Sequence, residues 1–525
     1  MPAALATLAL VAPAALVAIT LLALRHPGLR PRRVLLASRL ASVLALLLAI
    51  AAAILVARFG AVTSPLLGWY GLGLSVRLDA LTCCMFLLIA FVGLIVLQYS
   101  RNYLDGDPRQ GEFLGGLCLT LAAVTALVLA GNLLQLVGAW IATSLSLHRL
   151  LVFYRDRRAA VMAARKKFIV ARLSDICLIG AALALASAFG SADLATILDR
   201  ARQLTDTPAP VSAAAVLLAI AALLKSAQFP THGWLPEVME TPTPVSALLH
   251  AGIINAGGFL VIRFADVMVL FGPALHLLAI IGGFTALFGA VVMLTQPSIK
   301  GSLAWSTVGQ MGFMLLECGL AAFPIALVHL VAHSLYKAHA FLASGSVVEI
   351  ARTRWQPDLK HAPGVATILG NLTLALGIYA VASWLFGFLG NESAAMLSLG
   401  AILVMSLSLL LAQASQGRGH AAVLARTAML AMGATVMYFV LQGSAAWLLA
   451  STLPPPTVPD AAGLLIMLLA VASFGMVTVL QILAPKWLAS DRWCAMRIHL
   501  ANGLYANSLF NRLIGALRTP NTPAR

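Results

Sequence analysis

Apolar runs of roughly 20 residues recur along the whole chain, and they limit its possible folds more than any other feature. Such a run is long enough to cross a bilayer as an α-helix. Only 10% of the 525 residues are charged, whereas about a quarter are charged in a typical soluble domain. The runs are continuous and do not alternate with period two, which argues against an outer-membrane barrel. The sequence therefore predicts an all-α polytopic membrane protein.

About fifteen apolar segments, within a range of 13 to 16, are predicted to cross the membrane. The first is predicted to be retained as a helix, because its basic cluster follows the apolar run and a signal peptide has the reverse order. The segments fall near residues 3–24, 34–57, 79–98, 113–130, 132–154, 167–189, 210–229, 244–262, 267–294, 299–320, 325–350, 365–388, 393–414, 421–445 and 461–484.

Loops rich in Lys and Arg alternate with loops that carry few cations, and this asymmetry orients the chain. If the N-terminus is outside, the basic loops 25–33, 155–167, 352–361 and 416–420 and the C-terminal segment from residue 486 all become cytoplasmic, as the positive-inside rule requires. The same rule accounts for the net charge of +16 without a nucleic-acid partner. The tail is predicted either to lie on the membrane surface or to dock on a partner, and the first reading is preferred.

The stretch KSAQFPTHGWLPEVMETPTPVSALLHAG, which begins at Lys225, interrupts an apolar segment. It contains four prolines and several ionisable residues, including Glu237 and His250. Irregular backbone at membrane depth is tolerated where it is buried in protein or lines water, and broken helices recur at ion sites of transporters. We therefore interpret Lys225 as an ion-path residue. Snorkelling of its ammonium toward the interface is the alternative.

A second polar group lies in ALVHLVAHSLYKAHAFLASGS, where His329, His333 and Lys337 are spaced i, i+4, i+8 on one helical stripe. Three titratable groups in line favour a proton relay. The alternatives are hydrogen bonds to neighbouring helices or a metal site, although HLVAH lacks the glutamate of a zincin motif.

Other ionisable candidates lie at or within the predicted spans. Arg172 and Asp175 are three residues apart and can pair on one helix face. Asp79, Lys300 and Glu317 lie near predicted helix ends. The six cysteines show no metal-ligand spacing, and no nucleotide-binding or haem motif occurs.

These motifs, together with LDALT, YSRNYLDGD, SIKGSLAWSTVGQMGF and RLSD, closely resemble the antiporter-like subunits of respiratory complex I and of Mrp sodium/proton antiporters over residues 75–350. The resemblance implies inverted repeats with two broken helices and a hydrated axis of lysines, histidines and acids. It implies that Lys225 is the central lysine and that Lys337 belongs to the second broken region. It assigns His250, His329 and His333 to the axis, and it places Arg172 and Asp175 beside the first channel.

Two features depart from the general family pattern. Ile141 follows Trp140 where the family places a glutamate that pairs with the central lysine, and the spans after residue 365 carry no lysine or glutamate at mid-helix. His148 or an acid from a partner is expected to substitute for that glutamate. These departures, with AWIATSLSLHRLLVFYRDRRAAVMAARKKF and HAGIINAGGFLVIRF, resemble the membrane subunits of DAB inorganic carbon transporters.

That branch implies a subunit of the bacterial inner membrane that conducts H⁺ or Na⁺ and couples an ion gradient to carbon uptake. Its expected partner is a large peripheral zinc protein similar to β-carbonic anhydrases (DabA), docked on the basic cytoplasmic face around 155–167 and 352–361. No catalytic site, metal or cofactor is expected in this chain, and zinc is expected in the partner only. The alternatives are a proton-pumping subunit of a complex I or hydrogenase-type complex and an Mrp-type Na⁺/H⁺ antiporter.

The expected organisation has four parts: N-terminal transmembrane helices (1–74), an ion-translocating core (75–350), C-terminal transmembrane helices (351–485) and a cytoplasmic tail (486–525). The predicted ion-path residues are Lys225, His250, His329, His333, Lys337, Lys300, Arg172, Asp175, Glu237 and His148.

Overall fold

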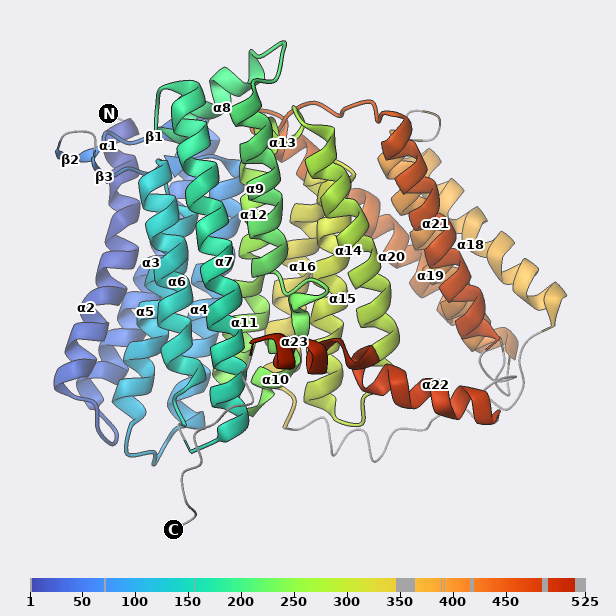
Figure 1. The fold of residues 1–525 in the computed structure, drawn as a ribbon, viewed down its shortest axis with the longest axis horizontal. Coiled ribbons are helices and arrows are strands. Elements are labelled where there is room, and N and C mark those ends of the chain that lie inside the picture. The colour runs from blue at the N-terminus through green and yellow to red at the C-terminus, as the bar shows by residue number, and fades with distance from the viewer. Residues whose placement is uncertain are drawn as a thin grey trace.

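The protein is a bundle of long helices in a computed structural model that describes residues 2–69, 72–154, 156–345, 364–388, 390, 392–415, 420–483 and 490–514 (Figure 1). Within these residues, twelve helices are long and apolar enough to cross a membrane. The predicted all-α polytopic membrane fold is thereby confirmed.

Each apolar segment predicted from the sequence coincides with a long helix or a helix pair. These are α1–η1–α2 (Pro2–Ala6, Thr7–Leu10, Val11–Arg25), α3 (Arg32–Phe59), α4 (Ala80–Tyr103), α5 (Gln110–Val128), α6 (Leu133–Leu151), α7 (Arg158–Phe189), α9 (Ala209–Lys225), α11–α12 (Thr243–Ala251, Ala256–Arg263), α14 (Gly272–Met293), α15 (Ile299–Gly319), α16 (Phe323–Leu342), α18 (Val365–Leu385), α19 (Ala394–Ala414), α20 (His420–Leu449) and α21 (Ala461–Ile482). Because α6, α9 and α15 are not among the twelve, the count of about fifteen crossings stays a prediction.

Shorter elements lie between and after the long helices. Between α3 and α4, β1 (Val62–Thr63) pairs antiparallel with β4 (Arg77–Leu78), and β2 (Leu67–Trp69) pairs with β3 (Leu72–Leu74). The sequence analysis did not anticipate these strands. The remaining short helices are α8 (Leu194–Arg202), η2 (Thr231–Gly233), α10 (Trp234–Glu237), η3 (Val238–Glu240), η4 (Ile253–Asn255), α13 (Ala265–Met268), α22 (Asp491–Ala501), η6 (Gly503–Tyr505) and α23 (Ala506–Ile514).

The two ends of the bundle differ in charge. The start of the chain and α8 lie at one end, whereas α10, α22 and α23 lie at the other (Figure 1). The basic segment 25–33 and the start of α7 are at the same end as α22 and α23. This clustering agrees with the predicted asymmetry, while the orientation in the membrane stays a prediction. The predicted cytoplasmic loop 352–361, and 416–420 except for its last residue, lie outside the described residues.

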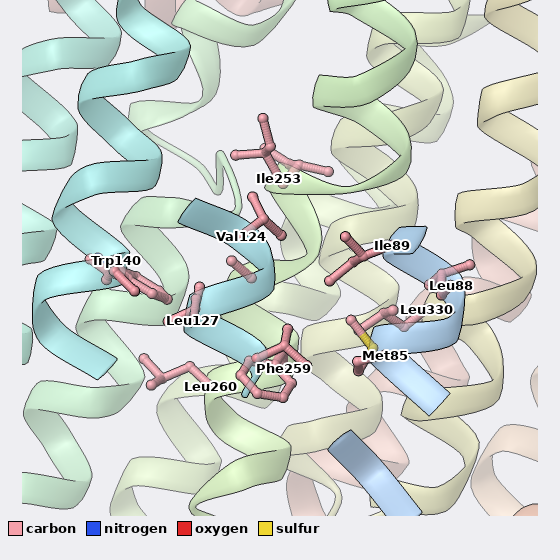
Figure 2. Close-up of a cluster of buried hydrophobic side chains, with 14 of the residues drawn as sticks. Met85, Leu88, Ile89, Val124, Leu127, Trp140, Ile253, Phe259, Leu260 and Leu330 are labelled. Carbon is pink, nitrogen blue, oxygen red and sulfur yellow. The ribbon is translucent and has the colours of Figure 1, made fainter. Parts of the chain in front are cut away.

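Small residues allow the helices to pack closely around a central apolar core. Figure 2 shows side chains of α4, α5, α6, α12 and α16 meeting there, with Trp140 directed from α6 toward Leu127 and Leu260. Elsewhere in the bundle, α14 and α15 approach so closely that a Cβ on Gly289 would lie 2.5 Å from the backbone nitrogen of Gly309. Such small-residue contacts are typical of helix packing in membranes.

Two helix interruptions lie close together in the sequence. α9 ends at Lys225, and prolines follow at 230, 236 and 242, where a regular helix would lose backbone hydrogen bonds. The second interruption, at Gly252, separates α11 from α12 through the turn η4.

The resemblance assigned Lys337 to a second broken region. α16 runs without a break from Phe323 to Leu342, and residues 325–344 contain neither glycine nor proline. The second broken region stays a prediction, because residues 346–363 lie outside the described residues.

Candidate ion-conducting site

Lys225 is the last residue of α9 and is buried, with 6% of its surface exposed. The chain leaves the helix through Ser226 and Ala227, and Ala227 adopts a left-handed backbone conformation with φ of 50°. α12 packs closely against this turn, because a Cβ on Gly257 would lie 2.6 Å from the carbonyl oxygen of Ala222. The turn that carries the lysine is therefore fixed by backbone packing.

The ammonium of Lys225 contacts the side chain and the carbonyl group of Trp140. Its Nζ lies 4.2 Å from the centroid of the Trp140 ring and 3.4 Å from the Trp140 carbonyl oxygen. A tryptophan face attracts a cation by about 0.5–2 kcal/mol, depending on desolvation. Trp140 thus compensates part of the cost of removing the lysine from water.

The acid that acts on Lys225 is Asp175 of α7. Its carboxylate attracts the ammonium of Lys225, and the guanidinium of Arg172 repels it. Arg172 and Asp175 form the ion pair that their spacing predicts, at 2.6 Å. Because Ile141 occupies the usual glutamate position, Asp175 is the acid available to Lys225 among the described residues.

His148, which we expected as a substitute for that glutamate, lies in different surroundings. Its ring packs against Phe168 at 5.3 Å between centroids. The charges that act on it are those of Lys167 and Arg172. Among the described residues, no hydrogen bond or ion pair joins His148 to Lys225.

Lys166 and Lys167, at the start of α7, are buried. Lys167 is 4% exposed, and its Nζ donates hydrogen bonds to the carbonyl oxygen of Ser144 (2.7 Å) and to the Ser144 hydroxyl (3.0 Å). Lys166 is fully buried and pairs with Glu237. The expectation that segment 155–167 is a free basic face is therefore wrong for these two lysines, because their charges are used inside the protein.

Glu237 joins three distant parts of the chain. Its carboxylate accepts hydrogen bonds from Lys166 and from the amide of Asn507 in α23, and Lys166 Nζ also lies 3.3 Å from Asn507 Oδ1. Gly233, four residues before Glu237, directly faces the Asn507 amide, so a larger residue there would require the Asn507 side chain to move. The C-terminal helix is thus anchored on the broken-helix segment.

His250 is linked to Lys337 through Thr307 and the carbonyl group of Leu303. His250 Nδ1 lies 2.9 Å from the Thr307 hydroxyl, which itself donates to the Leu303 carbonyl oxygen at 3.0 Å. Lys337 Nζ donates to the same oxygen at 3.0 Å. Because the threonine hydrogen is already used, His250 donates through Nδ1 and keeps a lone pair on Nε2.

His333, His329 and Glu317 continue from this cluster. The rings of His329 and His333 lie 6.3 Å apart between centroids, and His329 Nδ1 is 2.9 Å from the Glu317 carboxylate. Glu317 and His329 line a cavity of about 450 Å³, together with Gln310, Tyr438 and Gln442. Polar side chains therefore line this cavity beside the predicted stripe.

Lys300 and Asp79 have more peripheral positions. Lys300 begins α15, and its Nζ lies 3.3 Å from the Thr243 hydroxyl at the start of α11. Asp79 caps α4 by accepting from the Thr82 backbone N–H at 2.9 Å. It also forms ion pairs with Arg263 (2.5 Å) and with Arg77 (3.0 Å).

Four residues belong to the site but were not predicted from the sequence, namely Lys166, Lys167, Thr307 and Asn507. A signal existed for Lys167, because residues 167, 171 and 175 share one helical stripe with Asp175. Nothing local marks Asn507, whose partners lie hundreds of residues away. In the described residues, no group of three His, Cys, Asp or Glu side chains is arranged to hold a metal.

Comparisons with known proteins agree with this architecture. Residues 130–356 match the family model for the NADH:quinone oxidoreductase/Mrp antiporter transmembrane region, and residues 67–114 match the model for the complex I chain 5 N-terminus. The structure is similar to the Mrp complex from Dietzia sp. DQ12-45-1b, with a TM-score of 0.62 and 24% identity over 98% of this chain and 60% of that chain. That likeness concerns the fold.

Among curated relatives, the chain is 38% identical to the probable inorganic carbon transporter subunit DabB2 of Halothiobacillus neapolitanus, over 84% of this chain and 80% of the relative. It is 47% identical to the probable subunit DabB of Hydrogenovibrio crunogenus, over 54% of this chain and 56% of the relative. NAD(P)H-quinone oxidoreductase chain 5 of Synechocystis is 38% identical over 54% of this chain and 42% of its own length. The chain belongs to the DabB family of inorganic carbon transporter subunits, within the complex I and Mrp antiporter-like superfamily.

Proposed function

We propose that this protein is the cation-conducting membrane subunit of a two-component inorganic carbon transporter. In this proposal, H⁺ or Na⁺ moving down its gradient drives carbon uptake by a peripheral zinc partner similar to β-carbonic anhydrases. The observation that carries the proposal is the set of buried cationic and imidazole groups in the membrane bundle, Lys225, His250, His333 and Lys337, in a chain whose relatives are named as carbon transporter subunits.

Ionisable groups inside a membrane are costly and are usually retained for transport. In our mechanism, the ammonium of Lys225 is held by Trp140 and Asp175 and exchanges its proton with neighbouring groups. His250 relays through its free Nε2, while its Nδ1–H stays bonded to Thr307. Neutral imidazole accepts and releases protons near physiological pH, which suits it to such a relay.

The second half of the path runs through Lys337, His333 and His329 to Glu317. We propose that the cavity beside Glu317 connects this end of the path to the membrane face opposite α22 and α23. Lys300 and Glu237, near the face that carries α23, are proposed to serve the other opening. Arg172 sets the charge of Asp175 through their ion pair.

The partner is proposed to dock on the cytoplasmic face, at the exposed residues of segment 156–165. The loop 352–361 is the second proposed contact and lies outside the described residues. The proposed location is the bacterial inner membrane, and residues 75–350 form the proposed translocating core. Chemistry on CO₂ or bicarbonate is assigned to the partner, so the chain acts as a transporter subunit.

Affinity purification of this protein from its native membrane, with mass spectrometry and zinc analysis, tests the proposal. A large zinc-containing partner supports it. Flavin and iron–sulfur subunits would instead assign the chain to a complex I or hydrogenase-type assembly. Isolation of the chain alone, together with rescue of a salt-sensitive host, would favour an Na⁺/H⁺ antiporter. In the same strain, Lys225→Ala and Lys337→Ala are expected to abolish growth at ambient CO₂ but not at high CO₂.

A further inference from the structure

We propose that a cavity between α2, α5 and α6 binds one phospholipid whose headgroup carries a phosphodiester and a primary ammonium, as phosphatidylethanolamine does. The cavity lies at the end of the bundle that carries α22 and α23 (Figure 1). None of the candidate ion-path residues lines it. Such a site is independent of which cation the chain conducts, so it goes beyond the proposed function.

The cavity has a volume of about 630 Å³ and a lining that changes with depth. Arg109, Glu112 and Arg149 line it at the helix ends, where α5 begins and α6 ends. Leu119 lies about two helical turns beyond Glu112 along α5, so the lining becomes apolar about 10 Å deeper in the bundle. A phospholipid has its charges in the headgroup and hydrocarbon below it. The order of side chains along the cavity is therefore complementary to a lipid.

One wall of the cavity belongs to the outer surface of the bundle. Leu24 of α2 lines the cavity and is 70% exposed, and Leu21, about one turn earlier, is 59% exposed. α2 lies at the edge of the bundle (Figure 1). In a membrane-spanning helix at the edge of a bundle, exposed leucines face acyl chains. A lipid of the surrounding bilayer can thus reach the cavity from the side.

The guanidinium of Arg109 is held in place by aromatic rings and has no acidic partner. Its Cζ lies 4.3 Å from the centroid of the Phe153 ring and 5.6 Å from that of Tyr154. Asp107 accepts instead from the Tyr154 hydroxyl and from the backbone N–H of Arg109. A stacked guanidinium keeps its N–H groups at its edge, in the fork that matches a phosphate. Arg109 is therefore oriented for an oxyanion that the chain itself does not supply.

Arg149 and Glu112 complete the charge pattern of the cavity. Within the part of the chain that the structure describes, neither these two residues nor Arg109 forms an ion pair. Two cations and one anion in the same cavity suit a ligand that carries both signs of charge. The phosphate pairs with the two arginines, and the ammonium pairs with the carboxylate of Glu112. Basic pockets between membrane helices are known sites for lipid headgroups.

Two other classes of ligand fit this lining less well. An anionic headgroup such as that of phosphatidylglycerol places no positive charge beside Glu112. A small anion such as bicarbonate or inorganic phosphate meets the same carboxylate and leaves most of the 630 Å³ unfilled. The volume is instead within the roughly 300–1,000 Å³ of sites for larger organic ligands.

The test uses the full chain, purified in detergent and depleted of lipid, and follows its midpoint of thermal unfolding while lipid is added. A ligand that binds only the folded protein raises this midpoint by mass action. Phosphatidylethanolamine should act at a lower concentration than phosphatidylglycerol with the same acyl chains. Arg149→Gln should raise the concentration needed for half of the effect by about fivefold, the contribution of one basic residue beside a lipid phosphate. Arg149 is exposed, so its loss should leave folding intact.

Glu112→Gln tests the contact with the ammonium group. Glutamine removes the charge that attracts ethanolamine and repels phosphatidylglycerol, so the preference for phosphatidylethanolamine should disappear or reverse. Arg33→Gln removes an exposed charge at the start of α3, at the same end of the bundle. It is the matched control and should bind both lipids like the wild type.

Two results would overturn the inference. Equal effects of both lipids on the wild type, Arg149→Gln and Glu112→Gln would show that lipid only solvates the protein surface. A rise of the midpoint with sodium bicarbonate or inorganic phosphate in the absence of lipid, lost in Arg149→Gln, would assign the cavity to a soluble anion instead.

Discussion

The ammonium of Lys225 lies 4.2 Å from the centre of the Trp140 ring. The next residue, Ile141, occupies the position where the family pattern has a glutamate. A ring face attracts a cation without carrying a formal charge. In the proposed ion path, the charge of Lys225 is therefore balanced by an aromatic ring and by Asp175 from another helix. Among the described residues, Lys225 is thus held without a direct salt bridge.

We predict that Trp140→Leu lowers ion flux by about 2- to 30-fold, because removal of the cation–π contact costs about 0.5–2 kcal/mol. Trp140→Phe should lower the flux less, since phenylalanine keeps a ring that attracts the ammonium more weakly than tryptophan does. The measurement is flux in proteoliposomes. Trp447→Leu, at a side chain that is 81% exposed on α20, is the matched control and should conduct like the wild type.

A second prediction concerns the ion pairs of Asp79, which tie the start of α4 to the end of α12. Asp79→Asn keeps an oxygen for the helix cap but leaves the buried Arg263 without its charged partner. Breaking one side of a buried pair costs about 3–5 kcal/mol. The midpoint of thermal unfolding in detergent should fall accordingly, whereas Asp206→Asn, at an exposed loop position, should leave it unchanged. Equal midpoints in both variants would refute this role.

The same ion pairs predict the response to acid. Burial raises the pKa of Asp79, but Arg263, Arg77 and the Thr82 N–H together lower it further, and the net pKa is below that of an ordinary aspartate. Its stabilisation is therefore complete above the ordinary pKa of about 3.9 and is lost as pH falls below it. The wild-type unfolding midpoint should fall more steeply below about pH 4 than that of Asp79→Asn. If the unfolding midpoints of the two proteins depended on pH in the same way, the role assigned to Asp79 would be contradicted.

We next predict that Gly233→Ala releases the C-terminal helix, because the added methyl group would occupy the place of the Asn507 amide. Trypsin should then cut several-fold faster after Arg512, which lies on the exposed side of α23. Asn507→Leu should have the same effect. Gly433→Ala, in open surroundings on α20, serves as the control, and equal cleavage rates in all variants would show that the contact does not hold α23.

Glu317→Gln is predicted to lower ion flux by about tenfold or more, which corresponds to the roughly 1.5–3 kcal/mol of a hydrogen bond to a charged group. Glutamine retains a hydrogen bond to His329 but not the charge that a relay needs. Glu392→Gln, whose carboxylate contacts Tyr379 and Ser383 instead, provides the comparison. If both variants conduct normally, Glu317 and its cavity lie off the ion path.

Much of the fold could be predicted because it depends on local properties of the sequence. Continuous apolar runs define the long helices, and closely spaced prolines predict the break after Lys225. The i, i+4, i+8 spacing of His329, His333 and Lys337 places them along one helix, which α16 confirms. Their role in conduction stays a prediction.

The remaining features depend on contacts between distant residues. Lys166 and Lys167 resemble a basic loop in the sequence, yet they are buried because α7 continues into the protein and Ser144 and Glu237 offer them partners. Thr307 fixes the hydrogen bond of His250 from 57 residues away. The second broken region was expected from the family pattern alone, because the sequence around Lys337 itself favours an unbroken helix.

The contact between Asn507 and Glu237 spans 270 residues, and it therefore has a consequence for biosynthesis. By the time α23 leaves the ribosome, every lysine and histidine of the ion path has already been translated and is available for insertion. The segment around Gly233 and Glu237 receives its final neighbour only then. A protein that is not synthesised through α23 carries the whole set of buried charges without this contact.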